Sequence, residues 1–421
     1  MKAGIFKPLK LRPFRTLFGA QLFSDLGNWL DFIALQVIVA YHWGLDETAI
    51  ASVLIVLGLP WVIIGPFASV FVDRLPKKTV MIVCLLLRIV FVAGLFFAPN
   101  LYILLLFVFL KGTVSALYDP ARQSAIRMLV PDHLLAEAVT LSQLSVNTMK
   151  IAGPALGGAI IAIFGPKSPF LFEAAGFFIA AIFLLFLPSL KEIPNTDNSG
   201  NSLKRKYWID FSEGIKHIAH TPLLKLSIIL SSAAFFIIFL YDGLFVFIAQ
   251  ILGFNEGSFG LLISSVGFGS VAGSLLLGQW TKWNRKPIHL MASSSVLSGI
   301  LIVSVGLGGF RILDFPPLIW IIGACLLGLL GAGESVPYGY VLQSKTPKRM
   351  MGRVSSAAMS LQTFSMLIAP AAGAMFAKWM GAPSVMLGAG LTTIILGLLA
   401  LIAIIKRRAP IQEVKEKQME A

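Results

Sequence analysis

The sequence predicts an all-α membrane protein with twelve transmembrane helices, arranged as two six-helix halves with internal pseudo-symmetry. Hydrophobic residues make up 57% of the 421 residues and charged residues only 13%, whereas a soluble domain has roughly 25% charged residues. Continuous apolar runs recur along the chain, and about 20 such residues let a helix cross a hydrocarbon core. Because the runs do not alternate with polar residues, they favour helices over the strands of a β-barrel.

Twelve apolar segments are long enough to span a membrane. In chain order they cover residues 14–41, 48–71, 79–98, 101–119, 134–163, 168–188, 223–250, 257–280, 288–309, 316–340, 354–377 and 383–405. The first six lie within residues 1–188 and the last six within residues 223–405. A hydrophilic linker, 189–222, separates these halves, and a charged tail follows at 406–421.

The basic residues orient these spans. The segment before the first span and those after every second span hold 26 Lys and Arg residues, whereas the loops on the opposite side hold only Lys167, Arg311 and Lys378. Since Lys and Arg gather on the cytoplasmic side of a membrane, we expect both termini in the cytoplasm. The same distribution explains the formal net charge of +14, which therefore indicates no nucleic-acid partner.

The linker contains one further periodic segment. Trp208, Phe211, Ile215 and Ile218 recur at helical spacing and predict an amphipathic helix over residues 207–219. Such a helix either lies on the membrane surface or is an ordinary solvated linker.

Metal and cofactor sites are not expected. The only two cysteines, Cys84 and Cys325, both lie in apolar segments and are too few for a disulfide framework or a thiolate metal site. His217 and His220, three residues apart, are the only hint of a metal-binding or catalytic cluster. We therefore predict no metal, no cofactor and no enzymatic activity.

Two features recur at matching positions of the two halves. Pro131 precedes Pro154 by 23 residues, and Pro347 precedes Pro370 by the same number. The loops after spans two and eight both carry basic residues. Transporter folds are commonly built from such internal repeats.

The first span contains three polar residues. Asp25, Asn28 and Asp31 fall within an arc of about 120°, because an α-helix turns about 100° per residue. A charged side chain at bilayer depth costs at least ~2.5–3.5 kcal/mol. This polar face therefore predicts the wall of a cavity, with acids that merely pair with a basic neighbour as the alternative.

Other charged residues lie inside spans in both halves. The basic ones are Arg88, Lys111 and Lys150, and the acidic ones are Glu173, Asp242 and Glu334. Carboxyl groups in such places have pKa values that their surroundings can shift, which a proton-coupled carrier requires. We predict roles in substrate binding or proton coupling for all except Glu173, which we place too near the outer surface.

Small residues four positions apart predict close contacts between helices. They occur in the fifth span as Gly153 and Gly157, with Pro154 and Gly158 beside them. Similar pairs occur in spans two and eleven, and span eight contains Gly269 and Gly273. Because the four helices hold matching places in the halves, we expect the halves to meet along them.

Several motifs resemble those of the major facilitator superfamily. Residues 73–78, DRLPKK, resemble its signature loop between spans two and three. The segments 109–111, 118–126 and 153–158 resemble the branch containing macrolide efflux proteins and an enterobactin exporter, and residues 346–356 are similar to that branch's matching second-half loop. This resemblance implies the major facilitator fold in the plasma membrane, from a bacterium, in a secondary transporter that works by alternating access as a monomer.

The resemblance also implies roles for individual residues. The first and fourth helices of each half line the cavity in this family, which places Asp25, Asn28, Asp31, Lys111 and Glu334 there. The latch between the halves on the cytoplasmic side would be formed by the gating-loop residues Asp73, Arg74, Lys77 and Lys78.

The expected function is proton-coupled efflux of a lipophilic or amphipathic small molecule by a protein embedded in membrane lipid. The sequence has no GxxxxGK[ST] phosphate-binding loop, which argues against an ATP-driven pump. A lipid or lysolipid transporter of the same fold is the alternative, because a related branch with a similar Pro-Ala-basic elbow carries lysophospholipids. The absence of a polar catalytic cluster disfavours a membrane-embedded enzyme. The internal repeat disfavours a channel.

Overall fold

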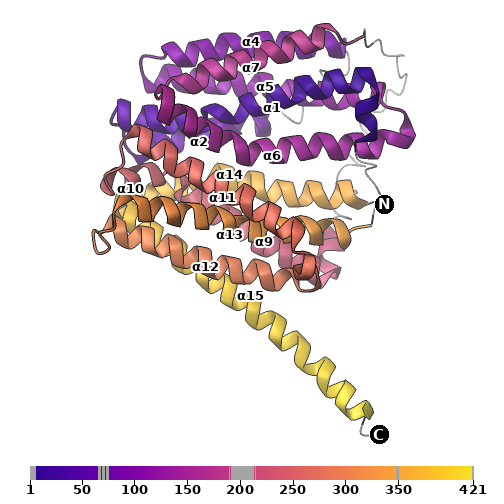
Figure 1. The fold of residues 1–421 in the computed structure, drawn as a ribbon, viewed down its shortest axis with the longest axis vertical. Helices are drawn as coiled ribbons and strands as arrows, with labels where there is room; N and C mark the ends of the chain where they lie inside the picture. Colours follow the sequence, from indigo (N-terminus) through magenta and orange to yellow (C-terminus); the bar gives the residue numbers. More distant parts are fainter. Residues whose placement is uncertain are drawn as a thin grey trace. The chain divides into compact units, whose positions relative to one another are not determined.

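A computed structural model describes residues 6–64, 68, 72, 75–188, 190, 213, 215–347 and 350–419 (Figure 1). Its described residues form helices and connecting turns, without a β-strand. They divide into two compact units. Unit 1 lies within Met1–Asp197 and Phe254–Gly267, and unit 2 within Asn198–Gly253 and Phe268–Ala421, so the division falls inside one helix.

Unit 1 contains the helices of the first half of the chain. They are η1 (Lys7–Lys10), α1 (Arg12–Val37), the π-helical turn η2 (Ile38–His42), α2 (Glu47–Ile63), α4 (Lys77–Phe97), α5 (Leu101–Leu129), α6 (Asp132–Phe164), α7 (Ser168–Leu185) and the start of α11 (Glu256–Gln279).

Unit 2 contains the remaining helices. They are α9 (Pro222–Asp242), α10 (Phe245–Ile251), the rest of α11, η3 (Thr281–Arg285), α12 (Pro287–Gly309), α13 (Pro317–Ser344), α14 (Met351–Met380) and α15 (Ala382–Met419).

The helices confirm the predicted architecture. Each of the twelve expected spans corresponds to a helix in the described part of the chain. Ten helical segments there are long and apolar enough to cross a membrane, and Glu47–Ile63 and Ala152–Phe164 are shorter apolar stretches.

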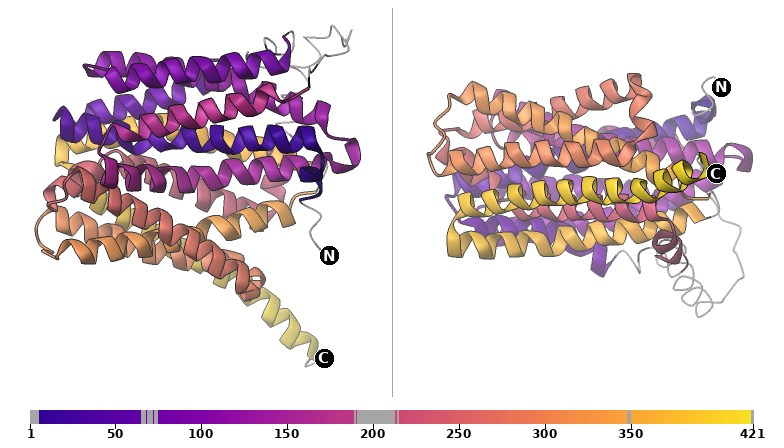
Figure 2. Two further views of the ribbon diagram at one scale, coloured as in Figure 1. Left: turned by 45° about the horizontal axis from the view of Figure 1, so that its top comes forward. Right: turned by 90° about the horizontal axis from the view of Figure 1, so that it is seen from below.

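The same packing pattern occurs in both units. In unit 1, α1 packs against α6 and α7, and α4 packs against α5 and α7. In unit 2, the equivalent helix α9 packs against α14 and α15, and α12 packs against α13 and α15. Figure 2 shows the long helices of each unit running side by side. The predicted pseudo-symmetry is therefore present within the units themselves.

Local sequence explains where several helices begin and end. The side chains of Asp46 and Asn100 accept hydrogen bonds from backbone N–H groups of the first turns of α2 and α5, which stabilises helix starts. Gly165 ends α6 and Gly381 ends α14, with φ of 92° and 82°, a conformation that glycine adopts without strain.

Three helices differ from the predicted spans. Helix α5 continues through Pro120 to Leu129, where we expected a loop over residues 120–133. The seventh span is broken at Gly243 into α9 and α10. Helix α15 continues through the tail to Met419.

Part of the predicted linker helix lies among the described residues. Residues 215–220 are helical, and Ile218 packs against a hydrophobic cluster of unit 2 that includes Leu224 and Ile228. Residues 207–212 lie outside the described residues. The described end of this helix is therefore packed partly on the protein.

Candidate functional site

Helix α1 carries a row of polar side chains through unit 1. Gln21, Ser24, Asp25 and Asp31 are each at most 6% exposed, and Asn28 is half-buried. At about 100° per residue these positions lie within one side of the helix. The hydrogen bonds described next show that the buried members of this row face other helices of unit 1.

The first cluster joins one lysine to two carboxylates. Lys111 of α5 forms ion pairs with Asp31 of α1 and, at 2.9 Å from Nζ to Oε1, with Glu173 of α7. All three residues are at most 3% exposed. We call Asp31, Lys111 and Glu173 the lysine cluster.

The position of Glu173 corrects the sequence-based expectation. We expected this residue near the outer surface, but its side chain is fully buried and ion-paired. Helix α7 has only 18 residues, and Glu173 lies in its second turn, where α1 and α4 pack against it. Its depth is set by this packing rather than by its distance from the end of the apolar segment.

The second cluster surrounds Asp25. Its Oδ1 accepts a hydrogen bond from Arg122 Nη1 at 3.1 Å, and its Oδ2 accepts bonds from Gln21 Nε2 at 2.9 Å and Ser145 Oγ at 2.8 Å. Arg122 Nη2 also pairs with Asp119 at 3.2 Å. We call Asp25, Asp119 and Arg122 the arginine cluster; it links α1 and α5, and Ser145 connects it to α6.

Sequence reasoning missed Arg122 because it assigned residues 120–133 to a loop. The spacing of Asp119 and Arg122 could have revealed the helix, since oppositely charged residues three apart face each other on a helix. The intervening Pro120 suggested a break instead.

Arg88 of α4 lies between aromatic rings. Its guanidinium carbon is 4.6 Å from the ring centroid of Tyr118 and 5.3 Å from that of Phe177. Nη1 donates a hydrogen bond to Ser24 at 3.0 Å, and the residue is fully buried. Thus Asp25, Asp31, Lys111 and Arg88 all contribute to one polar interior in unit 1.

The predicted acids of the second half lie in unit 2. Glu334 of α13 is half-buried, and its Oε1 accepts a hydrogen bond from Ser295 Oγ of α12 at 2.7 Å. Asp242 is the last residue of α9, beside the break at Gly243. These two acids therefore belong to a different unit from the clusters.

The gating-loop lysines bind backbone carbonyls in unit 1. Lys77 is buried, and its Nζ donates to the carbonyl oxygens of Val72 and Leu75. Lys78 donates to those of Leu185 and Leu187 at the end of α7. The helix dipole stabilises a positive group at a helix C-terminus, which is where Lys78 lies. The other two predicted gating residues, Asp73 and Arg74, lie outside the described residues. The side chain of Lys150, a base predicted in the fifth span, also lies outside what the structure describes.

The small-residue contacts that the structure describes each lie within one unit. Gly153 and Gly157 of α6 face Trp29 and Leu30 of α1, whereas we expected them to face the other half. Pro154 lies between them, half-buried. Close approach without side chains draws the α6 and α1 backbones together.

The remaining predicted glycines also lie at close helix contacts. Gly158 faces Gly260 in the part of α11 that belongs to unit 1. Gly269 and Gly273 face Cys325 and Leu329 of α13, all in unit 2.

Substituting Gly157 by alanine is expected to destabilise the protein by about 1–3 kcal/mol, the usual cost of overpacking a well-filled interior. A Cβ there would clash with the carbonyl oxygen of Leu30, which is backbone and cannot swing aside. Thermal unfolding in detergent measures the effect. Gly388→Ala is the matched control, since a Cβ at that helical glycine meets no atom within 4 Å. Equal melting temperatures for both variants would contradict the assignment.

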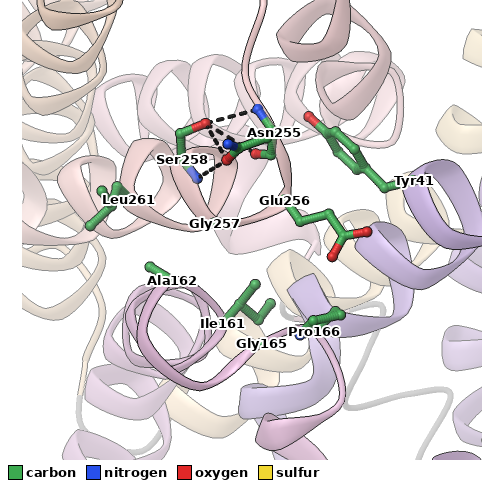
Figure 3. A pocket seen from close by; sticks show the side chains of 10 residues that line it. All are labelled: Tyr41, Ile161, Ala162, Gly165, Pro166, Asn255, Glu256, Gly257, Ser258 and Leu261. Atoms are coloured by element: carbon green, nitrogen blue, oxygen red, sulfur yellow. Dashed lines mark hydrogen bonds between the residues drawn. The ribbon is translucent and has the colours of Figure 1, made fainter.

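A separate pocket of about 780 Å³ lies in unit 1 (Figure 3). It is lined by Tyr41, by residues at the end of α6, and by residues 255–258 and Leu261 at the start of α11. Tyr41 donates a hydrogen bond to the Phe254 carbonyl oxygen at 2.9 Å. Glu256 lies 3.9 Å from His42, and both side chains are partly exposed. Sequence reasoning did not identify this pocket.

The suspected histidine pair has other partners. His217 Nε2 contacts the carbonyl oxygen of Lys345 at 3.1 Å, and His220 Nδ1 contacts that of Lys216 at 2.7 Å. Across the described residues, no three His, Cys, Asp or Glu side chains come together as metal ligands would.

Comparison with known proteins gives a consistent result. The family model of the Major Facilitator Superfamily matches residues 17–370 and, in a second match, residues 243–420. An uncharacterized MFS-type transporter of Bacillus subtilis (strain 168), YfiS, is 26% identical over 394 residues, covering 92% of each chain. Macrolide efflux protein A of Streptococcus pyogenes is 23% identical, covering 87% of this chain and 90% of its own.

A solved structure shares the fold. The structure of a POT family transporter in complex with a thioalcohol-conjugated peptide has a TM-score of 0.68 and 16% sequence identity, covering 94% of this chain and 96% of that one. With the family match across almost the whole sequence, this makes the chain a multi-pass membrane transporter rather than an enzyme. The chain belongs to the major facilitator superfamily.

Proposed function

We propose that the chain exports a lipophilic or amphipathic small molecule and uses proton entry to drive the export. The lysine cluster carries this proposal. It holds two carboxylates against a single ammonium group, and all three residues are at most 3% exposed. Because the second negative charge has no cation of its own within the cluster, this arrangement can take up and release one proton.

The substrate class rests on relatives and composition. One relative is named as a macrolide efflux protein, and macrolides are large, mostly apolar molecules. The chain contains 32 Phe residues, whose rings suit contacts with such a ligand. In this proposal Glu334 and Asp242 contribute from unit 2, both termini are cytoplasmic, and the protein works as a monomer.

Transport in inverted membrane vesicles tests this function. With an imposed proton gradient, we expect uptake of a macrolide antibiotic or of ethidium, a lipophilic cation, and loss of that uptake when the gradient is collapsed. Uptake of a fluorescent lysophospholipid alone would favour the lipid-transporter alternative. Uptake of all compounds unchanged by the gradient would contradict proton coupling.

Asp31→Asn and Glu173→Gln are each expected to reduce gradient-driven uptake to background while leaving the amount of folded protein unchanged. Each variant removes one carboxylate but leaves Lys111 paired with the other, so no buried charge is stranded. Asp314→Asn, a change of the same kind at an exposed loop residue, is the control and should transport normally. Full gradient-driven uptake by both cluster variants would remove the lysine cluster from the mechanism.

A further inference from the structure

Arg88 is a buried cation with hydrogen-bonding capacity to spare. Nη1 donates to Ser24, but Nε and Nη2 are buried with no hydrogen-bond partner among the described residues. A buried guanidinium ordinarily engages its donors, because each unpaired one is costly. The rings of Tyr118 and Phe177 stabilise the group by cation–π contact, which does not use those donors.

Arg88 lies between the two ionic clusters. Its partner Ser24 directly precedes Asp25 of the arginine cluster. Phe177 follows Glu173 of the lysine cluster by one helical turn. The guanidinium is close enough to interact electrostatically with both Asp25 and Glu173, yet it forms no ion pair with either.

The charged and titratable groups near Arg88 and in the two clusters come from α1, α4, α5 and α7. They are Asp25 and Asp31 on α1, Lys111, Tyr118, Asp119 and Arg122 on α5, Glu173 on α7, and Cys84 on α4 itself.

The buried charges of these clusters balance only when Arg88 is included. Asp25, Asp31 and Glu173 are the buried acids, and Lys111 and Arg122 are their direct partners. With Arg88 the buried groups number three acids and three bases, whereas Asp119 of the arginine cluster is partly exposed and lies outside this count. Glu173 Oε2 is also buried without a partner among the described residues. The lysine cluster therefore has one unused acceptor, on Glu173, and Arg88 has two unused donors of the opposite charge.

We propose that Arg88 is a counter-charge shared by the two clusters, and that it turns toward Glu173 when that carboxylate is ionised and toward Asp25 when Glu173 holds a proton. Arg88 is then a positioning residue: it passes the protonation state of the lysine cluster to the arginine cluster on the neighbouring part of α1. This proposal rests on the proposed function only in taking the cluster's proton to be the transported one.

Infrared titration of the purified protein in lipid vesicles tests the proposal without any transported compound. The carbonyl band of protonated Glu173 is identified by its loss in Glu173→Gln. In Arg88→Gln we expect the midpoint of this band to move to higher pH by about two units, the size expected for loss of one charge several ångströms away at the effective dielectric constant of a protein interior. Arg88→Lys keeps the charge, so its midpoint should lie close to that of the native protein. Arg127→Gln, at an exposed arginine, should leave the midpoint unchanged.

The exchange between clusters has its own readout. When Arg88 is present, Asp25→Asn should move the Glu173 midpoint to lower pH. Arg88 then has only the Glu173 carboxylate to neutralise, so it stabilises the ionised form of Glu173 more strongly. In the Arg88→Gln background the same change should have less than half that effect. An unmoved midpoint in Arg88→Gln, or an Asp25→Asn shift that is equal in both backgrounds, would overturn the proposal. If Arg88→Gln does not fold, an unmoved midpoint in Asp25→Asn alone would overturn it.

The titration and the transport assay fail separately. A Glu173 midpoint that depends on Arg88, found together with no gradient-driven uptake, would contradict the proposed function and leave the role of Arg88 standing. Gradient-driven uptake with a midpoint insensitive to Arg88 would do the reverse.

Discussion

Replacing Lys111 with methionine is expected to prevent the protein from accumulating in a folded form. The substitution leaves Asp31 and Glu173 buried beside each other without the cation that bridges them. Removing one partner of a buried ion pair costs about 3–5 kcal/mol, a large part of the roughly 5–15 kcal/mol that keeps a protein folded. Size-exclusion chromatography of a fluorescent fusion in detergent measures the folded amount.

Removing all three charges together separates folding from transport. Lys111→Met combined with Asp31→Asn and Glu173→Gln strands no charge, so we expect the folded amount to return toward that of the native protein. Gradient-driven uptake should remain absent in this triple variant. Lys216→Met, at an exposed lysine, serves as the control. Normal accumulation of the single Lys111→Met variant would show that the cluster's charges are not dependent on one another.

Replacing Arg122 with leucine is expected to cost about 3 kcal/mol, the lower end of the range for a buried pair. Asp25 loses its cation but keeps the hydrogen bonds from Gln21 and Ser145, which moderates the loss. Asp25→Asn should cost less, because Arg122 then retains Asp119. Thermal unfolding of the two variants in the same detergent measures the order.

The control for Arg122 lies on the same helix. Arg127 is exposed and five residues further along α5, so Arg127→Leu removes the same charge without opening a buried pair. A melting temperature lowered equally by Arg122→Leu and Arg127→Leu would contradict a specific role for the arginine cluster.

The sequence predicts the helices of this fold well because hydropathy is a local property. A run of apolar residues needs no tertiary partner to identify it as a span, and the twelve expected segments all correspond to helices. The exceptions occur where local signals conflict with packing. Pro120 and the charges around it suggest a loop, but the burial of Arg122 against Asp25 keeps α5 helical to Leu129.

The candidate site is only partly predictable. The cost of intramembrane charge identifies Asp25, Asp31, Arg88 and Lys111 as unusual without naming their partners. Lys111 pairs with a residue 62 positions away, Glu173, and nothing in the local sequence specifies this pairing. Glycine spacing likewise identifies a close contact without its partner: we expected Gly157 to face the other half of the chain, whereas it faces Leu30 of α1.

The glycines that end α6 and α14 show which positions of the two units correspond to each other. Gly165 and Gly381 are 216 residues apart, as are Pro154 and Pro370. With the same offset, Leu327 is the position in unit 2 that corresponds to Lys111, and Ala389 is the position that corresponds to Glu173. Leu327 and Ala389 both belong to a hydrophobic cluster of unit 2. One copy of the repeat thus fills this position with hydrocarbon and the other with ions. The hydrophobic residues at these positions of unit 2 are therefore a template for replacing Lys111 and Glu173 in an uncharged version of unit 1.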